Sequence, residues 1–214
     1  MLLSDADRER VNARVARAEE RVAAQFVTAV VAKSDAYPEL PWKAFALATA
    51  LAALAVVVGA GLRPGWTALQ DARVLVVAVL GAGLSAAALT VYVPRLARGL
   101  LGGVRAEGEV RQYAQALFLD RELFRTRART GVLLLVSLFE RRVVVLPDRG
   151  IPGDIGEADW QAVVRAMTPG LAAGRVADAL VEGVAGVEAL LAAHGMARRA
   201  QGGEELPDVI EERP

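Results

Sequence analysis

Residues 129–151 read R-T-G-V-L-L-L-V-S-L-F-E-R-R-V-V-V-L-P-D-R-G-I, and this stretch decides the fold. Its apolar runs predict two β-strands, 132–139 and 142–146, joined by a tight turn at Glu140 and Arg141. The valines and leucines do not alternate with polar residues, which is typical of strands that are covered on both faces. We therefore expect these two strands to lie at the centre of a core.

The overall composition limits the possible functions. The 214 residues are 54% hydrophobic and carry 25 basic and 25 acidic side chains, so no excess of positive charge points to a nucleic-acid partner. The chain contains no cysteine and one histidine, His194. These counts exclude a disulfide framework, a thiol nucleophile and a zinc site built from cysteine and histidine.

Two apolar segments without charged residues, 44–62 and 74–93, interrupt the chain. Each is close to the ~20 residues that a helix needs to cross the ~30 Å hydrocarbon core of a bilayer. Trp42, Trp66 and Tyr92 lie near the segment ends, where aromatic rings favour the membrane interface. Small residues in both segments would let two helices pack closely, although an Ala/Gly-rich composition explains them equally well. We predict a transmembrane helical hairpin.

The short link between the two apolar segments places both flanks on the same side of the membrane. More basic residues lie beside the outer ends of the pair than in the link. This positive-inside bias predicts a multi-pass protein whose soluble part is cytoplasmic. The preference for arginine over lysine and the abundance of Ala, Val, Leu and Gly indicate a GC-rich bacterium, so we expect the bacterial inner membrane.

Helices and one further strand surround the central strand pair. Ser4 and Asp7 form a capping-box pattern at the start of an amphipathic helix, and residues 25–32 read as a short strand. Apolar residues at helical spacing predict three more helices: 104–127, 157 to a stop at Thr168-Pro169-Gly170, and 176–194 with Gly195 as its cap. Together these elements predict a small three-layer α/β domain.

The predicted domain is split, because a lone strand at 25–32 needs partners and the other strands follow the apolar segments. The boundaries are a first domain part at 1–41, a transmembrane hairpin at 42–94, a second domain part at 95–195 and a polar tail at 196–214. We expect the tail to be disordered or loosely docked.

Several motifs resemble the TPM domain family: T-G-V-L-L-L-V-S-x-x-E-R-R-V at 130–143, D-R-G-I at 148–151, T-P-G-L-A-A-G-R at 168–175 and V-E-G-V at 181–184. The motif E-L-P-D at 205–208, together with the hairpin, resembles a bacterial subgroup of membrane proteins. The resemblance covers both soluble flanks and implies an α/β/α sandwich with a mixed sheet. It also implies a role in the maintenance of membrane complexes, calcium binding in a few members, and an acid phosphatase activity that is not general to the family.

Acidic side chains gather after the second strand of the pair. Asp148 follows that strand, Asp154, Glu157 and Asp159 come within eleven residues, and Asp35 follows the first predicted strand of the chain. Carboxylates are ligands for Ca²⁺ or Mg²⁺, and α/β sheets often place ligands in loops that follow strands. We name Asp148, Asp154, Glu157 and Asp35 as candidate metal ligands. The alternative is ordinary turn chemistry at Asp148 and favourable helix-dipole positions for Glu157 and Asp159.

Other polar residues point to structural roles. Gly150 would permit a positive φ or a close approach of two backbones. We expect Ser137, inside a buried strand, to bond backbone, and His194 to cap the end of a helix. The arginines between 121 and 129 fit a solvated helix end, or else a phosphate or lipid-headgroup patch. No residue is assigned a catalytic role.

Two functions of different classes remain open. The first is a non-enzymatic, membrane-tethered module that binds the bilayer and another membrane protein or complex. The second is a metal-assisted phosphomonoesterase that uses Asp148 and nearby carboxylates to hold Mg²⁺ or Ca²⁺ and to orient a water molecule. We favour the first because the chain is poor in catalytic groups.

Overall fold

The chain forms two compact units in a computed structural model that describes residues 2–62, 72–197 and 209–212. The first unit, which we call the split domain, comprises Met1–Asp35 and Ala106–Pro214. The second, the hairpin unit, comprises Ala36–Arg105. In this division, residues up to and including Arg105 pack within the hairpin unit.

The described residues of the split domain contain a mixed sheet with the strand order β3-β2-β1-β4. β1 (Gln25–Val31) runs parallel to both β2 (Gly131–Ser137) and β4 (Val209–Glu212). β3 (Arg142–Pro147) is antiparallel to β2. The polar tail therefore contributes an edge strand, whereas we expected a disordered or loosely docked segment. Residues 198–208 of the tail, with the E-L-P-D motif, lie outside the described residues.

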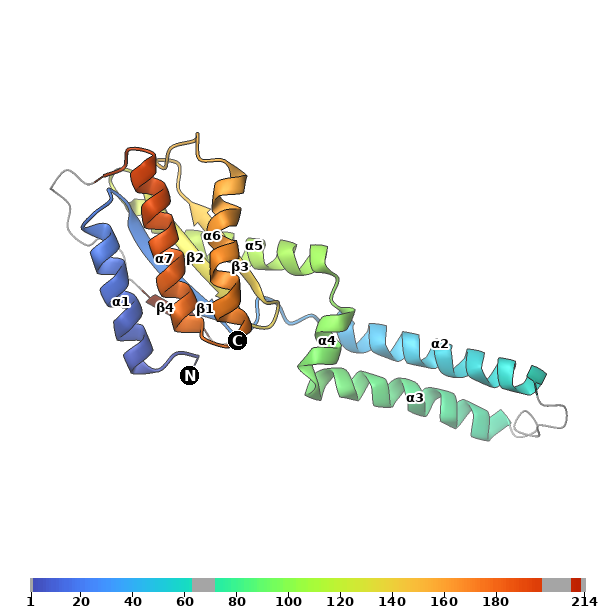
Figure 1. The fold of residues 1–214 in the computed structure, drawn as a ribbon. Coiled ribbons are helices and arrows are strands. Elements are labelled where there is room, and N and C mark those ends of the chain that lie inside the picture. The colour runs from blue at the N-terminus through green and yellow to red at the C-terminus, as the bar shows by residue number, and fades with distance from the viewer. Residues whose placement is uncertain (1, 63–71, 198–208, 213–214) are drawn as a thin grey trace. The chain divides into compact units, whose positions relative to one another are not determined.

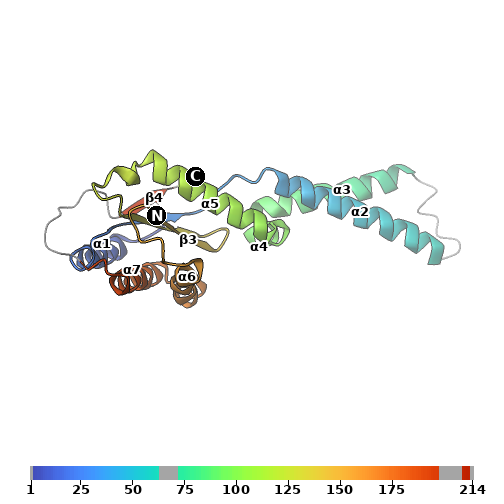
Figure 2. The same cartoon turned by 90° about the horizontal axis from the view of Figure 1, so that it is seen from above.

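Helices cover both faces of this sheet, as Figures 1 and 2 show. Three of them lie on one face: α1 (Asp5–Glu19), α6 (Glu157–Ala172) and α7 (Val176–Ala193). α5 (Gly103–Asp120) lies on the other. The predicted α/β/α sandwich with a mixed sheet is confirmed.

Each central strand sends alternate side chains into two separate cores. Phe26, Val30 and Leu134 pack with α1, α6 and α7, whereas Leu133 and Leu135 pack with α5. Since successive side chains of a strand point to opposite faces, residues 132–136 in the middle of β2 are all apolar when both faces are covered. All seven residues of β2 are buried. This explains why its sequence does not alternate.

Local signals mark several helix ends correctly. Asp7 N–H donates to Ser4 Oγ at 3.1 Å and Ser4 N–H donates to Asp7 Oδ2 at 3.4 Å, so the predicted capping box is present at α1. A hydrogen bond of 2.7 Å from Ser4 Oγ to Asp7 Oδ2 lowers the pKa of Asp7 below its ordinary value. After α7, Gly195 adopts a φ of 79°, the left-handed conformation expected of a helix-ending glycine.

Two helix ends differ from the prediction. α5 ends at Asp120, seven residues early, because Glu122 takes a left-handed φ of 51° and a 3₁₀ turn follows. α6 continues through Pro169 to Ala172. Pro169 has no N–H to donate to the carbonyl of Arg165, so the helix loses one backbone hydrogen bond there but does not end. The actual stop is Gly174, with a φ of 74° and a hydrogen bond from Arg175 N–H to Gly170 O of 2.9 Å.

The hairpin unit contains the long helices α2 (Glu39–Leu62) and α3 (Ala72–Tyr92) and the short helix α4 (Pro94–Leu100). Among the described residues, α2 and α3 are the two helices long and apolar enough to cross a membrane. Little of them is buried: 0% of the most apolar window of α2 and 11% of that of α3. Their apolar side chains therefore do not form the core of a water-soluble domain.

The two long helices pack closely at one glycine. A Cβ at Gly83 would lie 2.2 Å from Thr49 Oγ1 and 2.8 Å from the Phe45 ring, so only glycine fits without movement. At Gly61 and Gly81 a Cβ would meet nothing within 4 Å. The idea that small residues let the helices approach is thus confirmed at Gly83, and it does not hold at Gly61 or Gly81.

Candidate functional site

Asp148, the first predicted ligand, follows the end of β3. Its carboxylate is held by Arg129, which lies just before β2. Arg129 donates from Nε to Asp148 Oδ2 at 2.8 Å and from Nη2 to Oδ1 at 3.0 Å. Arg149 N–H also donates to Oδ1, at 2.8 Å. The Asp148 side chain is only 4% exposed. Both carboxylate oxygens thus serve a two-pronged ion pair, the strongest geometry for such a pair.

The backbone around this ion pair is equally tight. Arg129 has a φ of 56°, and its carbonyl oxygen accepts a hydrogen bond from Gly150 N–H at 2.7 Å. A Cβ at Gly150 would lie 2.0 Å from Ala128 O, so the predicted close approach of backbones is confirmed. The Arg129 guanidinium also lies 5.3 Å from the centre of the Phe124 ring. We call this arrangement the Arg129–Asp148 clasp, and it ties the start of β2 to the loop after β3.

The predicted ligands that follow Asp148 have separate roles. Asp154 is exposed in the loop before α6. Glu157 Oε1 accepts a hydrogen bond from Gln161 Nε2 at 2.9 Å, within the first turns of α6. Asp159 Oδ2 accepts from Gly156 N–H at 3.0 Å and so caps the helix. These contacts match the alternative of ordinary helix-start chemistry.

Asp35 and Asp148 lie at opposite ends of the strands of the sheet. In the parallel pair β1–β2, Gln25 faces Gly131 and Val31 faces Ser137, and Asp35 follows the Val31 end. Asp148 N–H donates to Gly131 O at 2.8 Å, at the other end. The two ends are one strand apart, about 20 Å for seven residues. The structure therefore does not bring Asp35 to Asp148.

No metal-binding group assembles within residues 2–62, 72–197 and 209–212: nowhere do three or more His, Asp or Glu side chains gather in a way that could hold an ion. A Ca²⁺ or Mg²⁺ site at Asp148, Asp154, Glu157 and Asp35 stays a prediction from the sequence. Its strongest member, Asp148, would have to leave the clasp to bind a cation.

A polar cluster that the sequence analysis missed lies where β1 and β2 end. Ser137 Oγ donates to Glu140 Oε2, Ser34 Oγ donates to Ser137 Oγ at 3.0 Å, and Ser34 N–H donates to Glu140 Oε1 at 3.0 Å. We expected Ser137 to bond backbone, and this was wrong. The available signal was topological: parallel neighbouring strands end at the same edge of a sheet, so polar residues after each strand meet there.

This cluster is too enclosed for chemistry on a substrate. A hydroxyl beside a carboxylate is a pattern that can activate a nucleophile. Here, however, Ser137 is 0% exposed and Glu140 is 8% exposed. The cluster instead joins the chain that leaves β1 to the turn between β2 and β3, and a second bond, from Leu138 N–H to Val31 O at 3.0 Å, reinforces that connection.

The remaining candidates also have structural partners. His194 ends α7, and its Nδ1 lies 2.9 Å from Leu190 O, so the capping role is confirmed. Arg125 pairs with Glu122 at 2.5 Å, and this hydrogen bond raises the pKa of Arg125 above its ordinary value. The last turn of α5 contains no basic residue, and Arg125 lies instead in the last turn of the 3₁₀ helix Leu123–Arg125. These arginines are therefore exposed near a helix end, as expected, but that end is not the end of α5.

Comparison with known proteins places this geometry in a family. The family model described as the TPM domain matches residues 83–190, just over half of the 214-residue chain. The chain belongs to the TPM domain family. The matched range contains the TPM motifs of β2 and the Asp148 loop, including the clasp, Ser137 and Glu140, whereas α1, β1 and Ser34 precede it. Membership of a subgroup with an inserted membrane hairpin stays a prediction.

A solved structure has the same fold. The TPM-family chain is similar to the NMR structure of BA42 protein from the psychrophilic bacterium Bizionia argentinensis, with a TM-score of 0.59 and 13% sequence identity. The likeness covers 98% of this chain and 95% of that chain. At this identity it shows the fold alone. A search of curated proteins finds no match to this chain.

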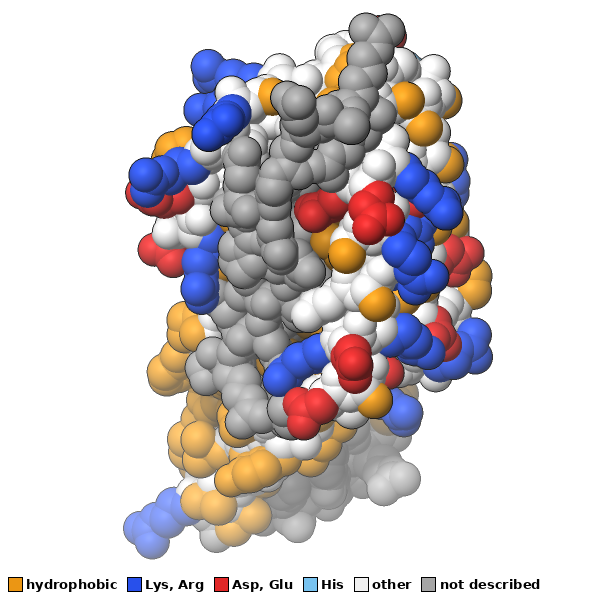
Figure 3. All heavy atoms as spheres, turned by 90° about the vertical axis from the view of Figure 1, so that its left-hand side faces the viewer, with side chains coloured by type: hydrophobic (Ala, Val, Ile, Leu, Met, Phe, Trp, Pro, Cys, Tyr) orange, Lys and Arg blue, Asp and Glu red, His pale blue; other side chains and the backbone are white. Residues whose placement is uncertain are grey.

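The surface of the TPM domain near α1 carries both signs of charge. Figure 3 shows Lys and Arg side chains interspersed with Asp and Glu on this face. Ion pairs join α1 to α7: Arg10 lies 2.7 Å from Asp178, and Arg14 lies 2.5 Å from Glu188. Arg21 binds the other oxygen of Glu188 at 3.2 Å. The described side chains on the face in Figure 3 thus carry both signs of charge.

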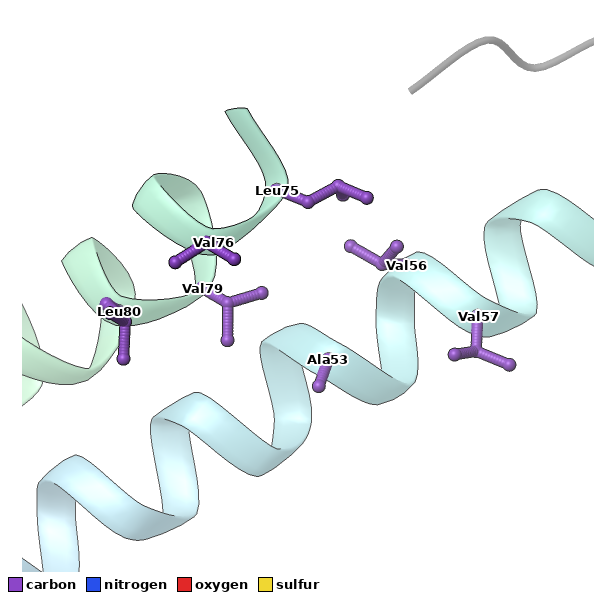
Figure 4. Close-up of a pocket in the computed structure, with 7 residues that line it drawn as sticks. All are labelled: Ala53, Val56, Val57, Leu75, Val76, Val79 and Leu80. Carbon is purple, nitrogen blue, oxygen red and sulfur yellow. The ribbon is translucent and has the colours of Figure 1, made fainter. Parts of the chain in front are cut away.

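The hairpin unit carries an apolar groove of about 340 Å³ between α2 and α3. Figure 4 shows the side chains that line it: Ala53, Val56, Val57, Leu75, Val76, Val79 and Leu80. Every one of these residues is aliphatic, so the groove offers no hydrogen-bonding group to a polar ligand. Hydrocarbon chains of lipid are the chemistry that fits such a surface.

Proposed function

We propose that this TPM-family chain is a membrane-anchored module that holds its α/β domain at the cytoplasmic face of a bacterial inner membrane. There it binds another membrane protein or complex and catalyses no reaction. The observation that carries the proposal is the pair α2 and α3, inserted between β1 and α5. Both helices are long enough to span a bilayer, and both expose their apolar side chains.

The exposure of these helices argues for lipid as their surroundings. Leu51 is 56% exposed, Leu54 57%, Val77 71% and Leu84 64%. Contiguous apolar surface of this kind is unusual on a monomer in water and marks membrane or protein contacts. A bilayer satisfies it along the whole length of both helices.

The contacts of the polar candidates support an interaction role over a hydrolytic one. Asp148 is bound on both oxygens by Arg129, and Ser137 is fully buried. Each is committed to holding the sheet together. Turnover of a phosphomonoester would require one of these contacts to open.

Membrane orientation can be tested by single cysteines, because the natural chain contains none. Thr67→Cys places a thiol in the link between the two apolar segments, and Ala158→Cys places one on the exposed side of α6. With a membrane-impermeant maleimide applied from the periplasmic side, we expect labelling of Thr67→Cys in intact cells and of Ala158→Cys only after lysis. The reverse pattern would contradict the cytoplasmic placement.

The partner can be tested by affinity capture of the full chain from crosslinked native membranes. We expect the same integral-membrane protein in every replicate. The matched control is Leu133→Asp, which places a charge in the core of the split domain, where Leu133 is 0% exposed, and leaves the hairpin sequence intact. This variant should reach the membrane without the partner. A partner retained by the control, or no reproducible partner with the wild type, would contradict the proposal.

A further inference from the structure

One end of the hairpin unit combines exposed aromatic, aliphatic and basic side chains. Trp42 at the start of α2 is 72% exposed, Tyr92 at the end of α3 is 82% exposed, and Leu96 on α4 is 49% exposed. Lys43 and Arg95, their neighbours in the sequence, are also exposed. Gly83 of α3 meets Phe45 and Thr49 of α2, whereas residues 75–80 of α3 line a groove with residues 53–57 of α2. The helices are therefore antiparallel, and these side chains share one end of the pair.

The short helix α4 follows that end directly. It contacts both α2 and α3 within the hairpin unit. Ala97, which is 5% exposed, lies on its packed side, and Leu101 just beyond it is 8% exposed. Leu96 and Arg95 point away from this packed side. α4 is therefore a short amphipathic helix whose outer side presents a leucine beside an arginine.

The charge at this end is positive. In the described part of the hairpin unit, residues 36–62 and 72–105, Glu39 is the one carboxylate, and Arg105 Nε binds it at 2.8 Å. The same end also carries Lys43, Arg95 and Arg98. Residues 36–62 and 72–105 of the unit thus contain more basic than acidic side chains. A negatively charged surface is the complementary partner.

We propose that this end of the hairpin unit lies in the headgroup layer and that Lys43, Arg95 and Arg98 bind the phosphate groups of anionic phospholipid. This inference rests on the proposed membrane anchoring and adds the class of lipid. Trp42 and Tyr92 occupy the interface that amphipathic rings favour, and Leu96 reaches the boundary of the acyl chains. Basic residues at that depth are attracted to anionic lipid over neutral lipid.

The test uses the full chain reconstituted in phosphatidylcholine vesicles with a trace of spin-labelled phosphatidylglycerol or spin-labelled phosphatidylcholine. The fraction of motionally restricted label gives the ratio of the two association constants. At low salt we expect a ratio of about five or more, since one interfacial cation contributes roughly that factor. In the variant Lys43→Gln/Arg95→Gln/Arg98→Gln the ratio should fall to about one. The control Arg73→Gln removes a cation near the start of α3, at the other end, and should keep the wild-type ratio.

Added salts identify the source of the phosphate group. Potassium chloride should lower the ratio by screening, and inorganic phosphate at equal ionic strength should lower it no further. Stronger displacement by inorganic phosphate would overturn the inference in favour of a site for the free anion. Two results would overturn this inference alone: a wild type that floats with vesicles but shows a ratio near one, and a triple variant that keeps the ratio of the wild type. A chain that does not float with vesicles overturns the anchoring as well.

Discussion

The split domain and the hairpin unit use the same apolar residues in opposite ways. In β2 of the split domain, Leu133 and Leu135 are 0% exposed, because helices cover both faces of the sheet. In the hairpin unit, Leu51 and Leu84 are 56% and 64% exposed. The difference teaches that hydrophobic content alone does not say where a segment lies. In one unit other side chains cover the leucines, and in the other the leucines are exposed, as we expect of helices that lie in lipid.

Truncation of a leucine should therefore have unequal effects in the two units. Leu133→Ala leaves a cavity in the domain core and should lower the free energy of unfolding by about 2–5 kcal/mol. Leu84→Ala removes an outward-facing group and should change it by less than about 0.5 kcal/mol. Urea unfolding of the full chain in detergent micelles, followed by the fluorescence of the buried Trp160, measures the loss in the split domain. The SDS concentration that separates α2 from α3 measures the loss in the hairpin unit. Equal losses would contradict the comparison.

Close packing in the hairpin unit should be confined to Gly83. Gly83→Ala drives a methyl group against Thr49 and Phe45 and should destabilise the helix pair by about 1–3 kcal/mol. Gly81→Ala, where a Cβ meets nothing within 4 Å, is the control and should be neutral. Disulfide formation between Ala53→Cys and Val79→Cys, on the two walls of the groove in Figure 4, reports pairing as SDS is added. Loss of pairing in both glycine variants would show that α2 and α3 meet elsewhere.

Asp148 should behave as a structural residue of the split domain. Asp148→Asn weakens the ion pair with Arg129 and should cost about 1–2 kcal/mol, a modest value because the Arg129 side chain is 46% exposed. Asp154→Asn, at an exposed loop position, should cost less than about 0.5 kcal/mol. Thermal unfolding with Ca²⁺, with Mg²⁺ and with chelator should give the same midpoint for each protein. Metal stabilisation of wild type that Asp148→Asn abolishes would favour the predicted metal site instead.

The Glu188 ion pairs should give the smallest effect and a distinct pH dependence. Burial raises the pKa of Glu188, but hydrogen bonds from Arg14 and Arg21 outweigh burial and hold it below its ordinary value of 4.5. The ionised carboxylate thus stabilises the folded state above that value, and the contribution is lost as the pH falls through the lowered pKa. Glu188→Gln should cost about 1 kcal/mol at pH 7 and flatten the loss of stability below pH 4.5.

The control for this pH profile is Glu182→Gln, at an exposed position of the same helix, which should change stability by less than about 0.5 kcal/mol. Unfolding free energies measured between pH 7 and pH 3 test whether the Glu188 ion pairs cause the loss of stability in acid. If Glu188→Gln keeps the acid sensitivity of the wild type, other carboxylates account for it.

Features that depend on neighbouring residues could be predicted from the sequence. The unbroken apolar run of β2 indicates cover on both faces, and Ser4 with Asp7 marks the start of α1. Gly195 marks the end of α7, and the Asp148-Arg149-Gly150 motif indicates the close backbone approach. Each of these signals arises from steric or hydrogen-bonding rules that act over a few residues, so no knowledge of the topology is needed.

Features that depend on topology could not be predicted in this way. Asp148 and Asp35 both follow strands. However, β3 runs antiparallel to β2, so Asp148 lies at the opposite end of the strands from Asp35. The same strand directions bring Ser34 and Ser137 together at the other edge. The tail also reads as polar from its composition, although its segment Val209–Glu212 pairs with β1, because backbone hydrogen bonds at a sheet edge do not require apolar side chains.

The most direct test of membrane anchoring compares the wild type with Leu51→Asp/Leu84→Asp in alkaline carbonate extraction of cell membranes. Both leucines are exposed, so in water these changes would have little effect. In a bilayer each aspartate near the middle of a span costs about 3 kcal/mol on insertion. We predict that the wild type stays in the membrane pellet and that the double variant is released. Release of both proteins by carbonate would contradict the account.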